Sequence, residues 1–324
     1  MRVLVVREAG GWGDVLCTLF AVRGLRLMHP DAQISYFCLD AFAPLLARIP
    51  DIDRLLTLGF SDAQPPRKVR LRRFHRHIGQ PFDPALYRLT RSYNKIADLW
   101  CPADVYERAT GGLMERSRVE CFCDAAGVPC PLVPRFPVSA EDRAWAEDLL
   151  DRAVPGTGPR VLCQMFSAKV TKNWPVARWA HLFGLLTARG FRPFVVLQSG
   201  AAFHGAPVVS GVSHVQAMAL ASVSACVVAP DSGFFHAAAA VGTPCVALFG
   251  PTDPRPYCRH YPLADVHWSP LAAAMDGCRP PCLYYPENGF PPRRGCQEEG
   301  DCMAAILPEN VLLSVERCAR ERTV

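Results

Sequence analysis

A turn in the second half of the chain carries an acid, a hydroxyl and an imidazole in close succession. Asp231, Ser232 and His236 stand between two short apolar runs that flank an alanine-rich helix former, and Asp231 or Ser232 can cap that helix. The pattern predicts a βαβ unit with parallel strands, so this turn and Gly250–Pro254 fall at the carboxyl ends of neighbouring strands. A helix N-terminus there predicts a phosphate site, although an ordinary buried βαβ unit has the same pattern.

A second polar turn, residues 166–175, lies between an expected strand and an expected helix. Ser167, Thr171 and Lys172 lie in it, and Pro175 starts the helix. Hydroxyls and an ammonium group suit a diphosphate, and Lys172 is placed to neutralise the charge of a leaving group. A loop with solvated lysines is the alternative interpretation.

A third turn is rich in glycine and follows the first expected strand. Gly11 and Gly13 let the backbone approach a ligand closely. They match part of a dinucleotide fingerprint, which Asp40 would complete as the ribose-binding acid, but its third glycine position holds Leu16. Asp14 is either a first-turn acid that favours the helix dipole or a carboxylate that takes a proton from an acceptor hydroxyl.

The positions of these turns predict two α/β domains. Each half of the chain begins with a strand, a polar turn and a helix, and Pro155–Pro159 reads as a linker. We expect a Rossmann-like domain over residues 1–155 and another over 160–324, facing each other across a cleft.

Composition limits the class of protein. The chain has 324 residues, is 50% hydrophobic and carries a net charge of +5, which is not typical of a dedicated nucleic-acid binder. Its N-terminus resembles a first strand more than a signal peptide, which predicts a cytoplasmic protein. Eight basic residues within Arg67–His77 predict either a solvated loop or a surface for an anionic acceptor or the inner membrane face.

Four cysteines are gathered near the C-terminus, in a loop over residues 278–302. Their spacing is close to that of common zinc sites without matching it. The cluster predicts either a structural site for zinc or iron or a set of free thiols. Its members are Cys278, Cys282, Cys296 and Cys302.

These features together resemble glycosyltransferase family 9, the ADP-heptose:lipopolysaccharide heptosyltransferases. The resemblance spans nearly the whole chain except about residues 60–155. Four blocks carry it: Val3–Arg26 with its glycine turn, Lys172–Trp179, Pro230–Pro254 with Asp-Ser-Gly-Phe-Phe-His, and the cysteine cluster followed by Ile306–Val311.

The resemblance implies a GT-B fold, with the acceptor on the first domain and the nucleotide-sugar on the second. It implies an inverting, metal-independent transfer of a sugar, heptose from ADP-heptose, to the lipopolysaccharide core or another glycan. Asp14 matches the family's proposed base, and Lys172 matches its lysine on the donor diphosphate. The donor-binding motif matches Asp231, Ser232, Gly233 and His236.

Two other functions remain open from the sequence. A sugar-nucleotide 2-epimerase shares the GT-B architecture, but it would need several acids in the cleft and no acceptor surface. The glycine turn lacks the serines of many relatives. The acceptor is therefore open, and a heptosyltransferase that glycosylates proteins is the other alternative.

Overall fold

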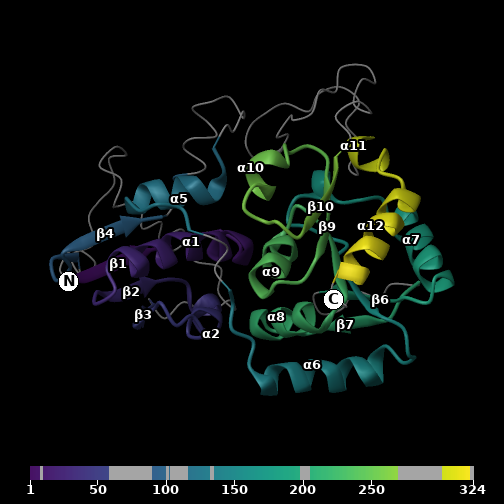
Figure 1. The fold of residues 1–324 in the computed structure, drawn as a ribbon, viewed down its shortest axis with the longest axis horizontal. Helices are drawn as coiled ribbons and strands as arrows, with labels where there is room; N and C mark the ends of the chain where they lie inside the picture. The colour runs from purple at the N-terminus through teal and green to yellow at the C-terminus, as the bar shows by residue number, and fades with distance from the viewer. Residues whose placement is uncertain are drawn as a thin grey trace. The chain divides into compact units, whose positions relative to one another are not determined.

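The computed structural model describes residues 1–7, 10–57, 90–99, 102, 116–131, 135–197, 205–268 and 301–321. The chain divides into two compact units. The first takes Met1–Tyr106 and Arg118–Pro134, and the second takes the remainder. Each unit is an α/β layer structure built on a parallel sheet (Figure 1). This confirms the α/β class.

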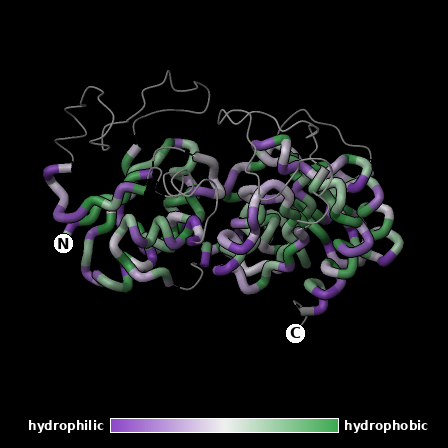
Figure 2. Tube along the Cα trace, turned by 90° about the horizontal axis from the view of Figure 1, so that it is seen from above, coloured by the Kyte–Doolittle hydropathy of each residue, from purple (hydrophilic) through white to green (hydrophobic). Residues whose placement is uncertain are grey.

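The first unit holds a four-stranded sheet in the order β3-β2-β1-β4, in which every pairing is parallel. Hydrophobic segments of the trace, coloured green, run through the interior of each unit (Figure 2). Helices α1 and α5 pack against each other in this unit. Its elements are β1 (Arg2–Val6), α1 (Trp12–Met28), β2 (Gln33–Phe37), η1 (Asp40–Phe42), α2 (Ala43–Leu46), β3 (Arg54–Leu56), β4 (Lys95–Asp98) and α5 (Arg118–Ala126).

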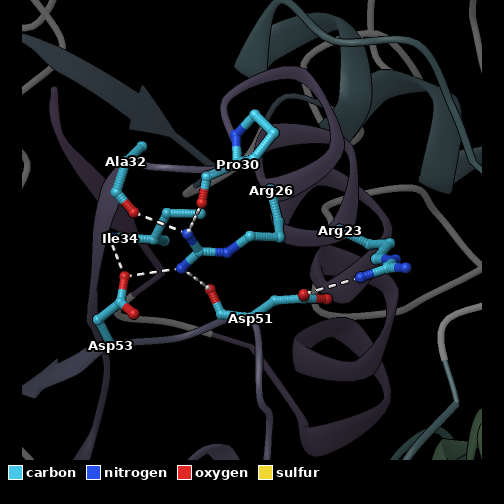
Figure 3. Close-up of polar contacts among 7 residues, drawn as sticks. All are labelled: Arg23, Arg26, Pro30, Ala32, Ile34, Asp51 and Asp53. Atoms are coloured by element: carbon cyan, nitrogen blue, oxygen red, sulfur yellow. Dashed lines mark hydrogen bonds and ion pairs between the residues drawn. The ribbon is translucent and has the colours of Figure 1, made fainter.

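One arginine fixes the C-terminal end of α1 to the sheet (Figure 3). Arg26 donates to the carbonyls of Pro30 and Ala32 at 2.7 and 2.8 Å and to the carboxylate of Asp53 at 2.7 Å. Burial raises the pKa of Asp53, but hydrogen bonds from the Ile34 amide and from Arg26 outweigh it and hold the pKa below its usual value. The turns on both sides of β2 are therefore tied to α1.

The second unit holds a six-stranded parallel sheet in the order β10-β9-β8-β5-β6-β7. Helices α7 and α12 pack together on one face, and α8 and α9 lie on the other (Figure 1). Its elements are α6 (Ala140–Ala153), β5 (Arg160–Cys163), η2 (Val170–Lys172), α7 (Val176–Ala188), β6 (Arg192–Leu197), β7 (Val208–Ser210), α8 (His214–Val223), β8 (Cys226–Pro230), α9 (Gly233–Val241), β9 (Cys245–Phe249), α10 (Arg255–Cys258), β10 (Ala264–Trp268), α11 (Asp301–Ala304) and α12 (Pro308–Glu321).

The border between the units lies earlier than the linker at Pro155–Pro159. We expected residues 1–155 to form the first domain, whereas the observed division assigns α6 to the second unit. The reason is packing, because α6 lies against α8 of that unit.

The central βαβ unit forms as the sequence predicted. Strands β8 and β9 pair in parallel on either side of α9. Helix α9 ends at Gly242, whose φ of 75° is left-handed, and a Cβ there would also collide with the guanidinium of Arg135. Glycine is therefore required at this position both by its backbone angle and by the close side chain.

Candidate functional site

Three polar loops meet at one edge of the second unit's sheet. Strand β8 pairs with β9 on one side and with β5 on the other. Asp231 directly follows β8, Gly250–Pro254 follows β9, and Lys172 lies in the loop after β5. The carboxyl ends of adjacent parallel strands lie together, which is where open α/β sheets bind ligands.

A buried ion pair joins two of these loops. The Nζ atom of Lys172 lies 2.5 Å from Oδ2 of Asp231, and the Thr252 hydroxyl donates to the same oxygen at 3.1 Å. The two charged side chains are 15% and 6% exposed. Burial raises the pKa of Asp231, but Lys172, with smaller contributions from His236 and Thr252, outweighs it and lowers the pKa below its usual value. A buried carboxylate therefore holds a cation beside the N-terminus of α9.

The loop that carries Lys172 is anchored by the two residues that follow it. The Trp174 indole donates to the carbonyl of Ile306 at 3.1 Å, and its ring meets Trp179 edge-on at 5.1 Å. Asn173 Oδ1 accepts from the Ser167 amide at 2.7 Å. The sequence Lys-Asn-Trp-Pro thus places the cation two residues before a tryptophan that is buried in the core.

Two other predicted donor ligands of this loop differ in their surroundings. The Ser167 hydroxyl donates to the Lys169 carbonyl at 2.7 Å and accepts from the Lys169 amide at 3.2 Å. Both of these hydrogen bonds of the Ser167 hydroxyl are therefore to the backbone of its own loop. Thr171 is buried in η2 next to Lys172.

The N-terminus of α9 differs from the expectation in one respect. Ser232 is its N-cap residue and Gly233 its first residue, but neither Ser232 nor Asp231 caps the helix. Asp231 is engaged by Lys172 and Thr252 instead. The buried Ser232 hydroxyl has no hydrogen-bond partner among the described residues. The predicted cap is therefore wrong, and the first turn keeps polar groups that suit an anion.

His236 lies in the first turn of α9 and is buried. Its Nδ1 atom is 2.8 Å from the hydroxyl of Tyr261, a residue that sequence reasoning missed. Tyr261 follows α10, and no spacing motif pointed to it. The sequence could have suggested it only by the presence of a tyrosine soon after the Gly250–Pro254 turn.

The acid of the glycine turn lies in the first unit. Asp14 is in the first turn of α1, and its Oδ2 accepts from the Gly11 amide at 3.2 Å. Arg118 donates to Oδ1 at 2.9 Å, and Arg7 lies 3.5 Å from Oδ2. Sequence reasoning missed both arginines. Arg7 directly follows β1, which was a usable signal, whereas Arg118 is 104 residues from Asp14.

Gly10 is more constrained than the two glycines that the sequence singled out. Its φ is 94°, and a Cβ there would lie 2.3 Å from the Arg7 guanidinium and 2.6 Å from the Asp14 carboxylate. By contrast, a Cβ on Gly11 would meet nothing within 4 Å. Gly13 is buried inside α1. Position 10 therefore requires glycine, because its backbone is left-handed and because Arg7 and Asp14 lie too close for a Cβ.

The cysteine cluster and the basic segment are mostly outside the described residues. Cys278, Cys282, Cys296 and the segment Arg67–His77 fall in undescribed ranges. Cys302 is buried in the core, where its sulfur would lie 2.8 Å from a Cβ on Gly250. In the described ranges there is no group of three or more His, Cys, Asp or Glu side chains that could hold a metal.

Within the described part of the chain, no helix combines the length and the apolar composition that a membrane crossing needs.

Comparisons of the sequence and of the structure with known proteins both find heptosyltransferases. The sequence model of Glycosyltransferase family 9 (heptosyltransferase) matches residues 106–274. Lipopolysaccharide heptosyltransferase 1 of Pseudomonas aeruginosa is 24% identical over 373 residues, covering 98% of this chain and 97% of that protein. The structure of Escherichia coli ADP-heptose lps heptosyltransferase II matches with a TM-score of 0.70 at 18% identity, covering 100% of both chains.

A further structure matches across nearly the whole chain. The iron-containing dodecameric glycosyltransferase TibC of enterotoxigenic E. coli has a TM-score of 0.65 at 15% identity, covering 99% of this chain and 79% of that one. The structural matches confirm the predicted GT-B fold class.

Proposed function

The chain belongs to glycosyltransferase family 9, whose sequence model matches more than half of it, and we propose that it transfers heptose from ADP-heptose to a lipopolysaccharide core acceptor. It is a heptosyltransferase-like glycosyltransferase. The names of its relatives support both the donor and the acceptor.

The observation that carries this proposal is the buried contact of Lys172 with Asp231 beside the N-terminus of α9. An ADP-sugar leaves behind a diphosphate whose negative charge grows as the glycosidic bond breaks. Lys172, the amides of the first turn of α9 and the Ser232 hydroxyl offer a cation and hydrogen-bond donors for that charge. Gly233 leaves the backbone accessible, and His236 adds a further donor.

We assign the proton transfer to Asp14. The acceptor hydroxyl attacks the anomeric carbon of the donor, the bond to the diphosphate oxygen breaks, and Asp14 takes the hydroxyl proton. Arg118 and Arg7 lie 2.9 and 3.5 Å from the Asp14 carboxylate and hold it in position. One in-line attack inverts the anomeric configuration, and the assigned residues accomplish it without a metal ion.

The test is a transfer assay with ADP-heptose and a lipopolysaccharide core acceptor that lacks heptose. We expect the acceptor mass to rise by one heptose, with NMR of the product showing the anomeric configuration opposite to that of the donor. Activity should persist in EDTA. Transfer with retained configuration would contradict the mechanism, and transfer only from UDP-sugars would contradict the donor assignment.

We propose that the basic segment Arg67–His77 contacts acceptor phosphates or anionic headgroups of the inner membrane face. Replacing its arginines with glutamine should raise the KM for the acceptor and reduce sedimentation with anionic vesicles, while the KM for ADP-heptose stays unchanged. An unchanged acceptor KM would contradict this assignment.

We also propose that Cys278, Cys282, Cys296 and Cys302 hold a structural zinc or iron ion. Support comes from their spacing and from a structural relative described as iron-containing. Elemental analysis of purified protein should find about one metal per chain, and serine substitutions should remove it while the rate of transfer per folded molecule changes little. Metal-free wild-type protein of normal stability would contradict the proposal.

A further inference from the structure

A cavity of about 350 Å³ lies at the amino end of the strands in the second unit's sheet. Arg160 and Arg192 line it, and they are the first residues of β5 and β6. Lys172 and Asp231 lie in turns that follow β5 and β8, at the carboxyl end of the same parallel strands. The cavity is therefore separate from the site that we propose for the ADP-sugar.

The sheet places two positive charges directly beside each other at this cavity. Arg160 of β5 and Arg192 of β6 are register partners in the parallel ladder. Like charges on directly paired residues repel each other. The pKa of Arg192 reflects this, because burial lowers it most, the charge of Arg160 lowers it further, and Asp151 opposes both. The carboxylate of Asp151 pairs with Arg160 but is 72% exposed, so it offsets this repulsion only weakly.

The linker before β5 is fitted around Arg192. The Nε atom of Arg192 donates to the carbonyl of Gly158, and its Nη1 atom donates to the carbonyls of Val154 and Gly156. Gly156 has a φ of 121°, and a Cβ on it would lie 3.1 Å from Cδ of Arg192. A Cβ on Gly158 would lie 1.8 Å from the carbonyl oxygen of Gly190. The guanidinium of Arg192 is therefore held in place by the backbone, which reduces the entropy cost of binding a ligand to it.

Both guanidinium groups keep donors that the described residues do not use. An arginine has five N–H groups, and Arg192 commits three of them to the linker through Nε and Nη1. Its Nη2 atom makes no hydrogen bond to a described residue. Arg160 donates to Asp151 through Nη2, whereas its buried Nε atom has no partner in that part of the chain. Unsatisfied donors at this depth are costly, which favours a ligand that accepts hydrogen bonds.

We propose that this cavity binds a phosphate group, either as inorganic phosphate or as part of a small organic phosphate. Phosphate oxygens accept several hydrogen bonds, and the planar fork of arginine matches them in geometry and in charge. Val223, Ala225 and Ala319 contribute apolar side chains to the lining, which suit the carbon atoms of an organic phosphate. A volume of about 350 Å³ is within the range of small-molecule pockets. The proposal goes beyond the glycosyltransferase activity and does not depend on it.

The test measures the binding of inorganic phosphate and of phenyl phosphate to the wild-type protein by calorimetry, in chloride buffers of equal ionic strength. We expect saturable binding that Arg160→Gln weakens about tenfold or more, because the substitution removes one of the two charges. Tighter binding of phenyl phosphate would assign the site to an organic phosphate, and equal binding would assign it to inorganic phosphate. The absence of saturable binding, or wild-type affinity in Arg160→Gln, would overturn the proposal.

Two further variants separate this cavity from other positive charges. Arg152→Gln is the matched control, since it removes the same charge from an exposed pair with Asp148 on α6. Its phosphate affinity should stay within about twofold of wild type, and a loss equal to that of Arg160→Gln would overturn the proposal. Lys172→Met tests whether phosphate binds at the carboxyl end of the sheet instead. Binding that Lys172→Met abolishes and Arg160→Gln leaves intact would also overturn the proposal.

A second measurement locates the site in the wild-type protein and keeps the proposal testable if Arg160→Gln does not fold. Hydrogen–deuterium exchange is compared with and without phenyl phosphate. We expect slower exchange in the peptides that cover residues 154–160 and 190–193, where the linker meets the two arginines. Protection confined to residues 166–175 and 230–236, or no protection in any peptide, would overturn the proposal.

Discussion

The turn after β1 and the turn after β8 both connect a strand to a helix, but their aspartates differ in position, exposure and contacts. Each follows a buried parallel strand and leads into a helix. Asp14 lies inside the first turn of α1 and is 27% exposed, with Arg118, Arg7 and the Gly11 amide on its oxygens. Asp231 precedes α9 and is 6% exposed, with Lys172 and Thr252 on one oxygen.

We propose that the two aspartates have different functions because their surroundings differ. An acid inside the first turn remains accessible and can exchange a proton. An acid placed before the helix is buried, and its charge is used to hold a lysine. The Ser232 hydroxyl, which has no partner among the described residues, is then placed to meet a ligand. We therefore interpret Asp14 as the reacting group and Asp231 as the support of a binding group.

The largest effect is expected from Asp14→Asn, because it removes the proposed proton acceptor. The rate of transfer should fall about 10²- to 10⁴-fold, while the affinity for ADP stays within twofold of wild type. Single-turnover kinetics and calorimetry measure the two quantities. Asp231→Asn should instead weaken ADP binding, because the Asp231 carboxylate holds Lys172 in position. If Asp14→Asn retained full transfer, the assignment of the base would be wrong.

Lys172→Met is expected to have the next largest effect, and on stability as well as on binding. The substitution leaves the Asp231 carboxylate buried without its cation, which costs about 3 to 5 kcal/mol of unfolding free energy. Urea unfolding measures it. The double variant with Asp231→Asn should recover part of the stability but not ADP binding. Equal stability of the single and double variants would contradict this account.

The same ion pair sets a pH dependence. The pKa of Asp231 is lowered in the folded protein, so its contribution to stability is present at neutral pH and is lost as pH falls through the acid range below about 4. Urea unfolding between pH 7 and pH 3 should therefore show a stability loss that Asp231→Asn lacks. Parallel curves for the two proteins would contradict the pairing.

Gly10→Ala tests how the first turn holds its acid. The added Cβ meets Arg7 and Asp14, and a φ of 94° is strained for alanine. We expect a loss of about 1 to 3 kcal/mol in stability and at least a tenfold lower rate of transfer. Gly11→Ala is the matched control, since its φ of −80° is ordinary and its Cβ would be in open space. An equal effect of both substitutions would contradict the geometry.

The smallest effect on stability is expected from Ser232→Ala, because its hydroxyl does not cap α9. The unfolding free energy should change by less than about 0.5 kcal/mol, whereas ADP affinity falls several-fold. Ser213→Ala is the control, since Ser213 caps α8 through the Gln216 amide at 3.3 Å and its loss should cost about 1 kcal/mol. A destabilised Ser232→Ala with normal ADP affinity would reverse the interpretation.

The sequence was sufficient for the parts of this structure that depend on local pattern. Apolar runs, turn residues and Gly242 predicted β8, α9 and β9, and the parallel strand order brought Lys172 near Asp231. Contacts set by tertiary packing were not predictable. Arg118 reaches Asp14 from α5, which is 104 residues further along the chain. Asp231 does not cap α9 because Lys172 and Thr252 engage its carboxylate, and a propensity rule does not include such contacts.

The central claim is that the edge of the second unit near Lys172 and Asp231 binds an ADP-linked sugar. Thermal shift with a panel of nucleotides measures this directly on wild type and on Lys172→Met. We predict that ADP and ADP-heptose stabilise wild type more than UDP-sugars or NAD do, and that Lys172→Met loses this stabilisation. A preference for NAD or a UDP-sugar, or an undiminished ADP shift in Lys172→Met, would contradict the claim.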